Sequence, residues 1–432
     1  MVAGAMQGDG IPAAGMPASG RPAEEVLAEV RRSQARDVDW RGGRSWAFTY
    51  FANDELLSLV SDAYRLGMSA NGLSGAAFPS LARFETEILD WVKDLVGGGA
   101  AGSITSGGSE SLLLAVKTAR DWARVTGGLP DQRRGNVVAS RSAHPGFAKA
   151  AHYLDLELRR GPVRPDQRSD VAGLAALIDA DTVLVVASAP SYPHGVVDDV
   201  RAISALAASA GLPCHVDACV GGMVLPFARA IGAWHGEFGL SVPGVTSISV
   251  DLHKFGYTAK GASVVLYRSQ ELFECQGFTH SDWTGGTYAV PNLCGTRPGG
   301  AITAAWAAIR YLGHAGYCEL TRQSLDAVAV LRTGLDRISG MSVVGDPDVN
   351  LIAFGDRAGR IRPIAADLRR RGWALGTQGD DSRGEQRSIH LTVTAGHLPV
   401  MPEFLADLER AAAAVSAGDP SAASATDPGR YN

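Results

Sequence analysis

The 432-residue sequence predicts an α/β protein with a large, mostly parallel sheet and a smaller α+β domain after it. Between residues 102 and 261, short β-rich segments alternate with helical ones, which is typical of a parallel sheet covered by helices on both faces. After Pro298 the pattern changes to long helical stretches followed by short strands. A chain of this length also exceeds what one simple core usually supports, so more than one domain is expected.

The apolar periodicity assigns the elements of both domains. In the large domain we expect helices at residues 111–125, 146–154 and 200–210, and strands at 136–140, 182–187, 214–216 and 247–250. Two amphipathic helices precede them, at residues 24–36 and 54–66, the second capped by Asn53. In the smaller domain we expect helices at residues 301–312 and 320–338, and strands near Val343 and Leu351 and at 389–393.

Five segments result: a disordered arm (1–20), an N-terminal segment (21–100), the large domain (101–300), the small C-terminal domain (301–415) and a disordered tail (416–432). The arm lacks the basic flank and continuous apolar stretch of a signal peptide. The tail is a weakly hydrophobic run of Ala, Ser, Asp, Gly and Pro, which cannot bury enough surface to offset the entropy of ordering it.

Composition excludes several classes of function. The net charge is −5 and no basic run occurs, so we expect no nucleic-acid partner and favour a small molecule. No apolar window is long enough to span a membrane. The five cysteines form no Cys-x-x-Cys pair, so we expect neither a disulfide framework nor a metal site, and a reducing, cytoplasmic location fits.

The first candidate for chemistry is Lys254, in the segment SVDLHKFG at residues 249–256. It directly follows a β-rich run and a histidine, where a lysine must be buried or functional. Its ε-amine can attack an aldehyde only when deprotonated, and a partly desolvated lysine at a strand end is expected to have the lowered pKa that this requires. Taken alone, an exposed turn lysine is the commoner outcome.

The second candidate is Asp217, at the end of a short apolar strand in HVDACVGG, residues 215–222. Such a carboxylate suits the ring nitrogen of pyridoxal 5'-phosphate (PLP), because a protonated pyridinium withdraws electrons from the Cα of a bound substrate. Taken alone, an Asp at a strand end more often caps a helix.

Two further segments complete the pattern. TSGGSE, residues 105–110, opens the helix at 111–125 with free amides that can seat a phosphate. His144, between a strand and a helix, can stack on a cofactor ring, although a lone His is more often a surface or core residue. Phosphate turn, His144, Asp217 and Lys254 all fall where a strand ends, which is where open α/β sheets bind ligands. The sequence therefore predicts a PLP enzyme.

Six segments of the chain together resemble the sphingosine-1-phosphate lyase family: residues 105–111, 144–154, 193–195, 215–222, 249–268 and 285–300. The most specific is HKFGYTAKGASVVLYR, which contains Lys254 and ends at Arg268. The resemblance covers most of residues 50–310. It implies a fold-type-I PLP-dependent transferase fold, similar to aspartate aminotransferase, with a seven-stranded sheet, beside the group II amino-acid decarboxylases.

The resemblance also implies roles for individual residues. Lys254 would form the Schiff base, Asp217 would face the ring nitrogen and His144 would stack on the ring. Further cofactor contacts would come from Gly108, Ser109, Cys219 and His253, although such a cysteine is more commonly a small buried filler. Thr296 falls where the family has a serine that reaches the phosphate from the neighbouring subunit, which implies a homodimer with shared active sites.

The family grips its substrate phosphate with residues that match Tyr50, Asn71 and Lys260. Its pattern Asn-x-Leu-His-Pro-Asp-x-Phe-Pro reads NGLSGAAFP here, at residues 71–79, so Ser74 replaces a histidine. That replacement removes a charge-assisted hydrogen bond of about 1.5–3 kcal/mol, and the substrate is therefore expected to differ. Tyr50 and Asn71 could equally serve packing and turn formation.

The predicted function is a PLP-dependent carbon–carbon lyase of the aldehyde-lyase type. It would cleave the Cα–Cβ bond of a β-hydroxy amine, phosphorylated or not, with Lys254 as proton shuttle. Decarboxylation of an amino acid, an aldolase working in the bond-forming direction, transamination and simple PLP binding remain alternatives. The cofactor residues do not choose among the reactions, because the bond held perpendicular to the ring is the one that breaks.

Overall fold

The computed structural model describes residues 15–17, 19–380 and 384–418, and the chain forms two compact units, residues 1–39 and 40–432. The first unit contains the predicted amphipathic helix as α1 (Ala23–Gln34), which buries none of its residues. Most of the predicted arm and tail lies outside the described residues, namely 1–14, 18 and 419–432. Ser416, assigned to the tail, instead ends helix α12 (Met401–Ser416).

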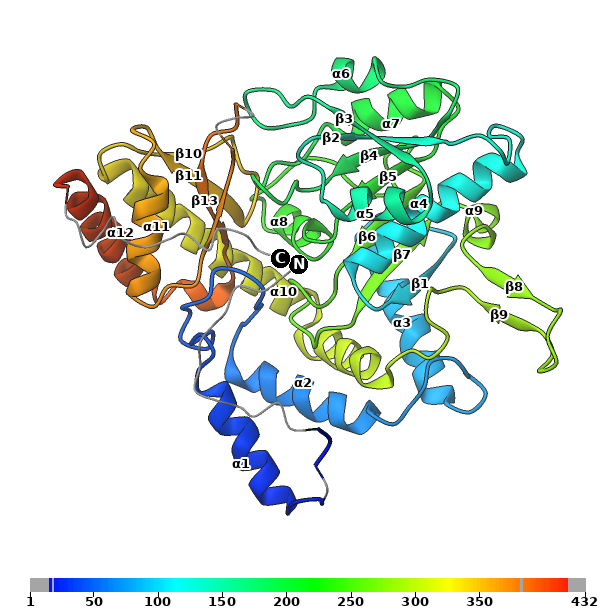
Figure 1. Cartoon of the computed structure of the whole chain (residues 1–432), viewed down its shortest axis with the longest axis horizontal. Helices are drawn as coiled ribbons and strands as arrows, with labels where there is room; N and C mark the ends of the chain where they lie inside the picture. The colour runs from blue at the N-terminus through cyan, green and yellow to red at the C-terminus, as the bar shows by residue number, and fades with distance from the viewer. Residues whose placement is uncertain (1–14, 18, 381–383, 419–432) are drawn as a thin grey trace. The chain divides into compact units, whose positions relative to one another are not determined.

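A seven-stranded sheet forms the centre of the large domain, in the order β1-β7-β6-β5-β4-β2-β3 among the described residues (Figure 1). Its strands are β1 (Ala101–Thr105), β2 (Asn136–Ser140), β3 (Glu157–Gly161), β4 (Thr182–Ser188), β5 (Cys214–Asp217), β6 (Ser247–Val250) and β7 (Ser263–Tyr267). β7 runs antiparallel to β1 and β6, and the other pairs are parallel. The predicted seven-stranded, mostly parallel sheet is confirmed.

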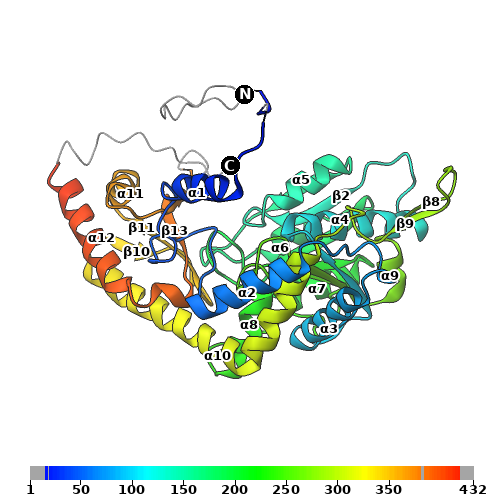
Figure 2. The same cartoon turned by 90° about the horizontal axis from the view of Figure 1, so that it is seen from below.

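Helices cover both faces of this sheet, so its central strands are apolar along their whole length. Every residue of β2, β4, β5, β6 and β7 is buried, as expected for strands that face helices on both sides. Figure 2 shows α4 and α5 on one face, and α7 and α8 on the other. Between the N-terminal segment and the small domain, the described helices are α2 (Asp54–Gly67), α3 (Pro79–Leu95), α4 (Gly108–Val125), α5 (Gly146–Tyr153), α6 (Val171–Ala175), α7 (Val200–Ser209), α8 (Leu225–Ala230) and α9 (Gln270–Glu274).

The smaller domain has its own antiparallel sheet and its own core. Its strands lie in the order β10-β11-β13-β12 and are β10 (Met341–Val343), β11 (Leu351–Asp356), β12 (Gly376–Gln378) and β13 (Ser388–Thr392), packed with α11 (Ile361–Arg370) and α12. Trp46, from the segment before α2, is fully buried in this core and stacks on His397 at 4.1 Å between ring centroids. The N-terminal segment therefore ties into the C-terminal domain.

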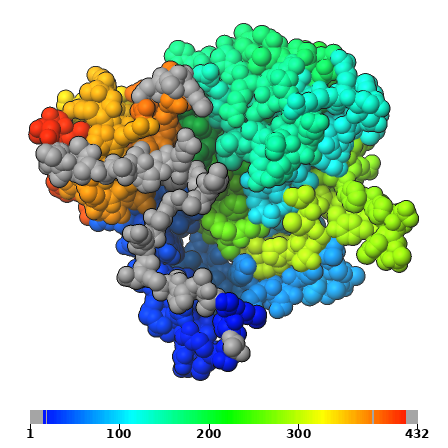
Figure 3. Space-filling view, in the orientation of Figure 1, coloured from blue at the N-terminus to red at the C-terminus, as the bar shows by residue number. Residues whose placement is uncertain are grey.

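The connection between the domains agrees with the prediction of two helices. The element α10 (Gly299–Arg337) consists of two helical stretches that meet at Gly313, whose backbone is not helical (φ 54°, ψ −175°). Glycine tolerates that conformation, so the first stretch ends there as predicted. The second stretch follows directly and begins earlier than the predicted residue 320. The structure also contains a hairpin that was not predicted, β8 (Phe278–His280) and β9 (Tyr288–Val290). It projects at one side of the molecule in Figure 3, and all three residues of β8 are exposed, whereas Val290 of β9 is buried. No helix in the described part of the chain is long and apolar enough to cross a membrane.

The predicted cap of α2 supports a test of stability. Asn53 Oδ1 accepts a hydrogen bond from the Leu56 amide at 2.9 Å, which satisfies one of the free N–H groups at the helix start. Asn53→Ala should lower the free energy of unfolding by about 1 kcal/mol, measured by urea denaturation. Asn53→Ser keeps a capping oxygen and should retain most of that stability. Equal losses in the two variants would show that the cap is not the cause.

Candidate active site

A cavity of about 210 Å³ lies at the carboxyl ends of β4, β5 and β6, beside the first turn of α4. Ser188 ends β4, Asp217 ends β5 and Asp251 directly follows β6, so the sheet edge supplies polar groups to one place. Seven predicted residues line this cavity: Gly108, Ser109, His144, Asp217, Cys219, His253 and Lys254. Segments that are more than 140 residues apart in the sequence thus meet as predicted.

Lys254 lies in the loop after β6, and its ammonium group pairs with a buried carboxylate. Lys254 Nζ is 2.9 Å from Asp251 Oδ2. Burial by itself lowers the pKa of Lys254, but the negative charge of Asp251, with a smaller contribution from Asp217, outweighs it and raises that pKa well above its ordinary value. The lowered pKa that the sequence predicts for Lys254 is wrong, because a carboxylate three residues earlier lies within ion-pair distance.

The carboxylate of Asp217 is held at the end of β5 by neighbours on two strands. Its Oδ1 accepts hydrogen bonds from the Cys219 amide at 3.1 Å and from the Ser249 hydroxyl at 3.5 Å. Ser249 also contacts Nε2 of the buried His215 at 3.2 Å. Burial, with Asp217 and Asp251 nearby, raises the pKa of the Cys219 thiol well above its ordinary value, so this cysteine is neutral. These contacts orient the acid that was predicted to face the ring nitrogen.

The first turn of α4 is shaped for a close-fitting anion. The first N–H groups of a helix have no intrahelical partner and attract phosphate. A Cβ at Gly108 would lie 2.7 Å from Asp251 Oδ2, so only glycine fits there. His253 stands beside this turn, and its buried Nδ1 makes no hydrogen bond to any described residue. Free amides and an unsatisfied imidazole nitrogen at one point are what a phosphate group requires.

Two aromatic side chains complete the wall. His144 Nδ1 accepts a hydrogen bond from the Gly146 amide at 3.0 Å, which fixes the ring, and burial lowers the His144 pKa so that the ring is neutral. Tyr192 also lines the cavity, and its ring contacts His390 of β13 at 4.4 Å between centroids. Sequence reasoning missed both Tyr192 and Asp251, although Tyr192 directly precedes the family-like segment 193–195 and Asp251 lies inside the lysine segment.

The residues that are present fit PLP. An amine, a carboxylate, a neutral imidazole and an amide-lined turn converge on one enclosed space, and each suits a different part of that cofactor. Lys254 suits the aldehyde, Asp217 the ring nitrogen, and α4 with His253 the phosphate. The orphaned His253 Nδ1 is the clearest sign of an anionic partner within the described residues.

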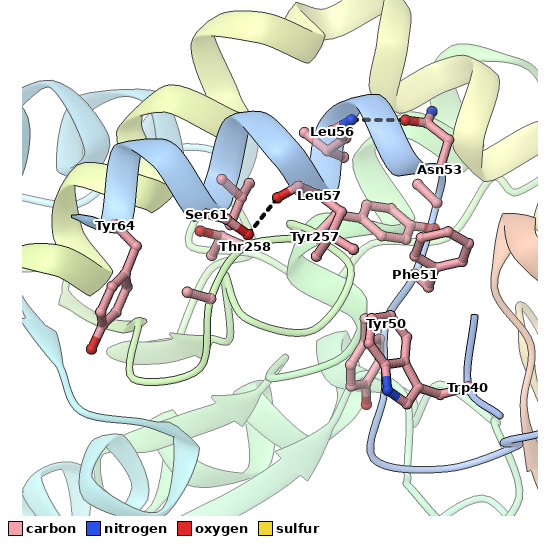
Figure 4. Close-up of a pocket in the computed structure, with 13 residues that line it drawn as sticks. Trp40, Tyr50, Phe51, Asn53, Leu56, Leu57, Ser61, Tyr64, Tyr257 and Thr258 are labelled. Carbon is pink, nitrogen blue, oxygen red and sulfur yellow. Dashed lines mark hydrogen bonds between the residues drawn. The ribbon is translucent and has the colours of Figure 1, made fainter. Parts of the chain in front are cut away.

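Tyr50 and Lys260 lie next to the cavity but do not line it. Lys260 Nζ folds back over the Tyr50 ring, 4.6 Å from its centroid, and donates to the His253 carbonyl at 3.2 Å. Lys260 is an exposed residue, and desolvation together with the charge of Lys254 lowers its pKa to about 8. Tyr50 also lines a second pocket of about 320 Å³ beside α2. Figure 4 shows Tyr50 and Trp40 together at one end of this pocket and Tyr64 at the other end.

Three predicted residues form a separate, largely exposed group outside the cavity. Asn71 Nδ2 donates to Thr296 Oγ1 at 3.4 Å, and Asn71 Oδ1 accepts from the Leu73 amide. Ser74 accepts a hydrogen bond from the Ala77 amide within a turn. The structure does not bring Asn71, Ser74 or Thr296 into the cavity of their own chain.

Comparisons with known proteins agree with this site. Residues 13–356 match the family model of the pyridoxal-dependent decarboxylase conserved domain. The sphingosine-1-phosphate lyase of Oryza sativa subsp. japonica is 37% identical over 395 residues, which are 89% of this chain and 72% of that protein. Sphingosine-1-phosphate lyase 1 of Rattus norvegicus is 36% identical over 389 residues, 89% of this chain and 67% of that protein.

A solved structure extends the likeness to three dimensions. The sphingosine-1-phosphate lyase of Burkholderia pseudomallei K96243 superposes with a TM-score of 0.86 at 33% identity and covers 92% of each chain. The resemblance drawn from the sequence is thereby confirmed, as is the expected cofactor. The chain is a PLP-dependent lyase that belongs to the pyridoxal-dependent decarboxylase family and has sphingosine-1-phosphate lyases among its relatives.

Proposed function

We propose that the protein cleaves the Cα–Cβ bond of a β-hydroxy amine that carries an anionic group. The observation that carries this proposal is the position of Lys260, a second cation beside the cavity that the cofactor seat does not use. An amine with a distant anion can place that anion on Lys260 while its amino group reaches Lys254. The sphingosine-1-phosphate lyases among the relatives support the same reaction class.

The cofactor, when bound, supplies an electron sink that weakens bonds at the substrate Cα. Asp217, fixed by Cys219 and Ser249, keeps a proton on the ring nitrogen. Lys254, which lines the same cavity, would hold the cofactor aldehyde and, once free of it, could carry a proton at the substrate Cα. Tyr192 presents a phenol at the cavity wall, and burial raises its pKa, so it can donate a hydrogen bond to a substrate oxygen. These side chains bind and orient the substrate and move its protons. Lys260, which binds the substrate anion, orients the Cα–Cβ bond for cleavage.

We also propose that the protein acts as a homodimer with shared sites. Thr296 is exposed and lies outside the cavity of its own chain, where a residue that serves a neighbouring subunit would lie. Nearby exposed apolar side chains, Phe278, Trp283 and Leu293, are each more than half exposed, as expected of an association surface. A cytoplasmic location completes the proposal, since all five cysteines are unpaired.

The reaction can be tested with matched substrates. The purified protein is mixed with phosphorylated β-hydroxy amines, their unphosphorylated forms and common α-amino acids, and aldehyde and carbon dioxide are measured in parallel. Aldehyde should appear, fastest from the phosphorylated amines. Carbon dioxide from an amino acid, without aldehyde from any amine, would contradict the proposal and indicate a decarboxylase.

The anion grip predicts a selective defect in Lys260→Ala. Loss of one charge-assisted hydrogen bond should raise KM for a phosphorylated substrate by about tenfold or more and leave the unphosphorylated analogue nearly unchanged. Because the Lys260 pKa is about 8, wild-type affinity for the anion should also fall as the pH rises above 8 and the amine loses its charge.

Lys149→Ala is a matched control, because Lys149 also stands over a tyrosine ring, at 5.7 Å from the Tyr153 centroid, but lies on the exposed face of α5. It should behave like wild type. If Lys260→Ala weakens both substrates equally, Lys260 supports the fold of the site and does not select an anion.

Shared sites predict complementation between two defective variants. Lys254→Ala and Thr296→Ala are each expected to be impaired, but dissociated and reassociated mixtures contain heterodimers with one intact site. The mixture should recover about a quarter of wild-type activity, as random pairing in a two-fold dimer requires. Recovery no greater than the summed activities of the separate variants, with dimers present by light scattering, would contradict a shared site.

A further inference from the structure

Asp251 is an enclosed acid that forms an ion pair with the reactive lysine. Its side chain is 2% exposed and directly follows β6. Oδ2 lies 2.9 Å from Lys254 Nζ and 3.9 Å from His253 Nε2. The Asp251 carbonyl also accepts a hydrogen bond from the Lys254 amide at 3.2 Å, so one tight turn fixes both ends of the ion pair.

The surrounding elements leave this carboxylate little freedom to turn away. The first residue of α4, Gly108, approaches so closely that an added Cβ would lie within 2.9 Å of both carboxylate oxygens. The Asp251 amide donates to the Cys219 carbonyl at 3.2 Å, which ties it to the end of β5. The polar and charged groups that act on Asp251 or on its partner Lys254 come from several elements: Tyr50, His144, Tyr192, Asp217, Cys219, His253, Lys260 and Ser263.

This pairing opposes the reaction for which Lys254 is needed. To bond to an aldehyde, the ammonium must lose a proton to solvent, its nitrogen must bond to the aldehyde carbon, and the aldehyde oxygen must leave as water. Burial alone would favour the neutral amine, but Asp251 is the largest influence in the opposite direction. Burial likewise tends to raise the pKa of Asp251, but Lys254 and His253 outweigh it and hold that pKa below its ordinary value.

We propose that Asp251 is a positioning residue that holds Lys254 as an ammonium ion whenever the lysine is not covalently bonded, and thereby controls when Lys254 reacts with an aldehyde. When a substrate amine replaced Lys254 on the cofactor carbon, the lysine would be released as a neutral amine and would take a proton from the incoming substrate ammonium or from solvent. As an ammonium ion it could return to the ion pair with Asp251, which is 2.9 Å long in this structure, and could not compete with the substrate for the same carbon. Asp251 therefore biases the exchange toward the bound substrate.

Formation of the bond with the cofactor provides a test that needs no substrate, so its result does not depend on which reaction the enzyme performs. Full-length protein is freed of cofactor with hydroxylamine and gel filtration, then mixed with PLP at concentrations where the rate no longer depends on PLP. The visible absorbance of lysine-bound cofactor is followed between pH 6 and 10. In Asp251→Asn the rise of rate with pH should shift down by about 1–3 pH units, so the variant should react at least about tenfold faster near pH 7.

Asp217→Asn is the matched control, because Asp217 is a buried acid of the same cavity with a smaller influence on Lys254. Its pH profile should shift by less than that of Asp251→Asn. Asp251→Ser, with a small polar side chain, replaces Asp251→Asn if circular dichroism shows that the asparagine variant is unfolded. An unshifted profile, or a rate that is lower at every pH, in whichever folded Asp251 variant is measured would overturn the proposal and leave Asp251 a purely structural residue.

Discussion

A charge removed from water must find a partner, and the arrangement of the cavity follows from that requirement. Lys254 and Asp251 meet it for each other, while Asp217 is held by an amide and a hydroxyl from neighbouring strands. The glycine at position 108 lets the helix α4 approach the carboxylate closely. The first turn of α4 therefore covers the ion pair of Lys254 and Asp251 and also presents free backbone amides to a phosphate. The same packing thus forms the cofactor site and holds the lysine in place.

The parallel sheet determines where the polar residues of the cavity lie. Parallel strands end at a common edge, which brings Ser188, Asp217 and Asp251 together from separate crossovers. The smaller domain contributes to the same wall, because His390 of β13 packs on Tyr192. A movement of the small domain would therefore change the position of Tyr192 in the cavity wall, because His390 moves with that domain.

The residues that the proposed function assigns to substrate choice lie around the cofactor seat and not within it. Lys260 leans over Tyr50, which lines the pocket beside α2. Ser74, which stands where the related family has histidine, lies in an exposed turn with Asn71 and Thr296 nearby in the sequence or in space. Cofactor chemistry and substrate selection are thus assigned to different surfaces, which allows one of them to vary without the other.

The sequence by itself determined β2, β4, β5 and β6 and the placement of Gly108, His144, Asp217 and Lys254 near strand ends, because apolar periodicity and turn chemistry are local. It did not predict the positions of β1, β3 and β7. Lys254 illustrates what local reasoning cannot reach. Its burial was predictable, but the sign of its pKa shift depends on how the loop after β6 folds, because that loop brings Asp251, three residues earlier, within 2.9 Å of the amine, with Gly108 of α4 packed against the carboxylate. The exposed positions of Ser74 and Thr296 and the half-buried position of Asn71 are likewise products of packing. Only the tertiary structure decides them, since long-range contacts set which charges meet and which surfaces remain open.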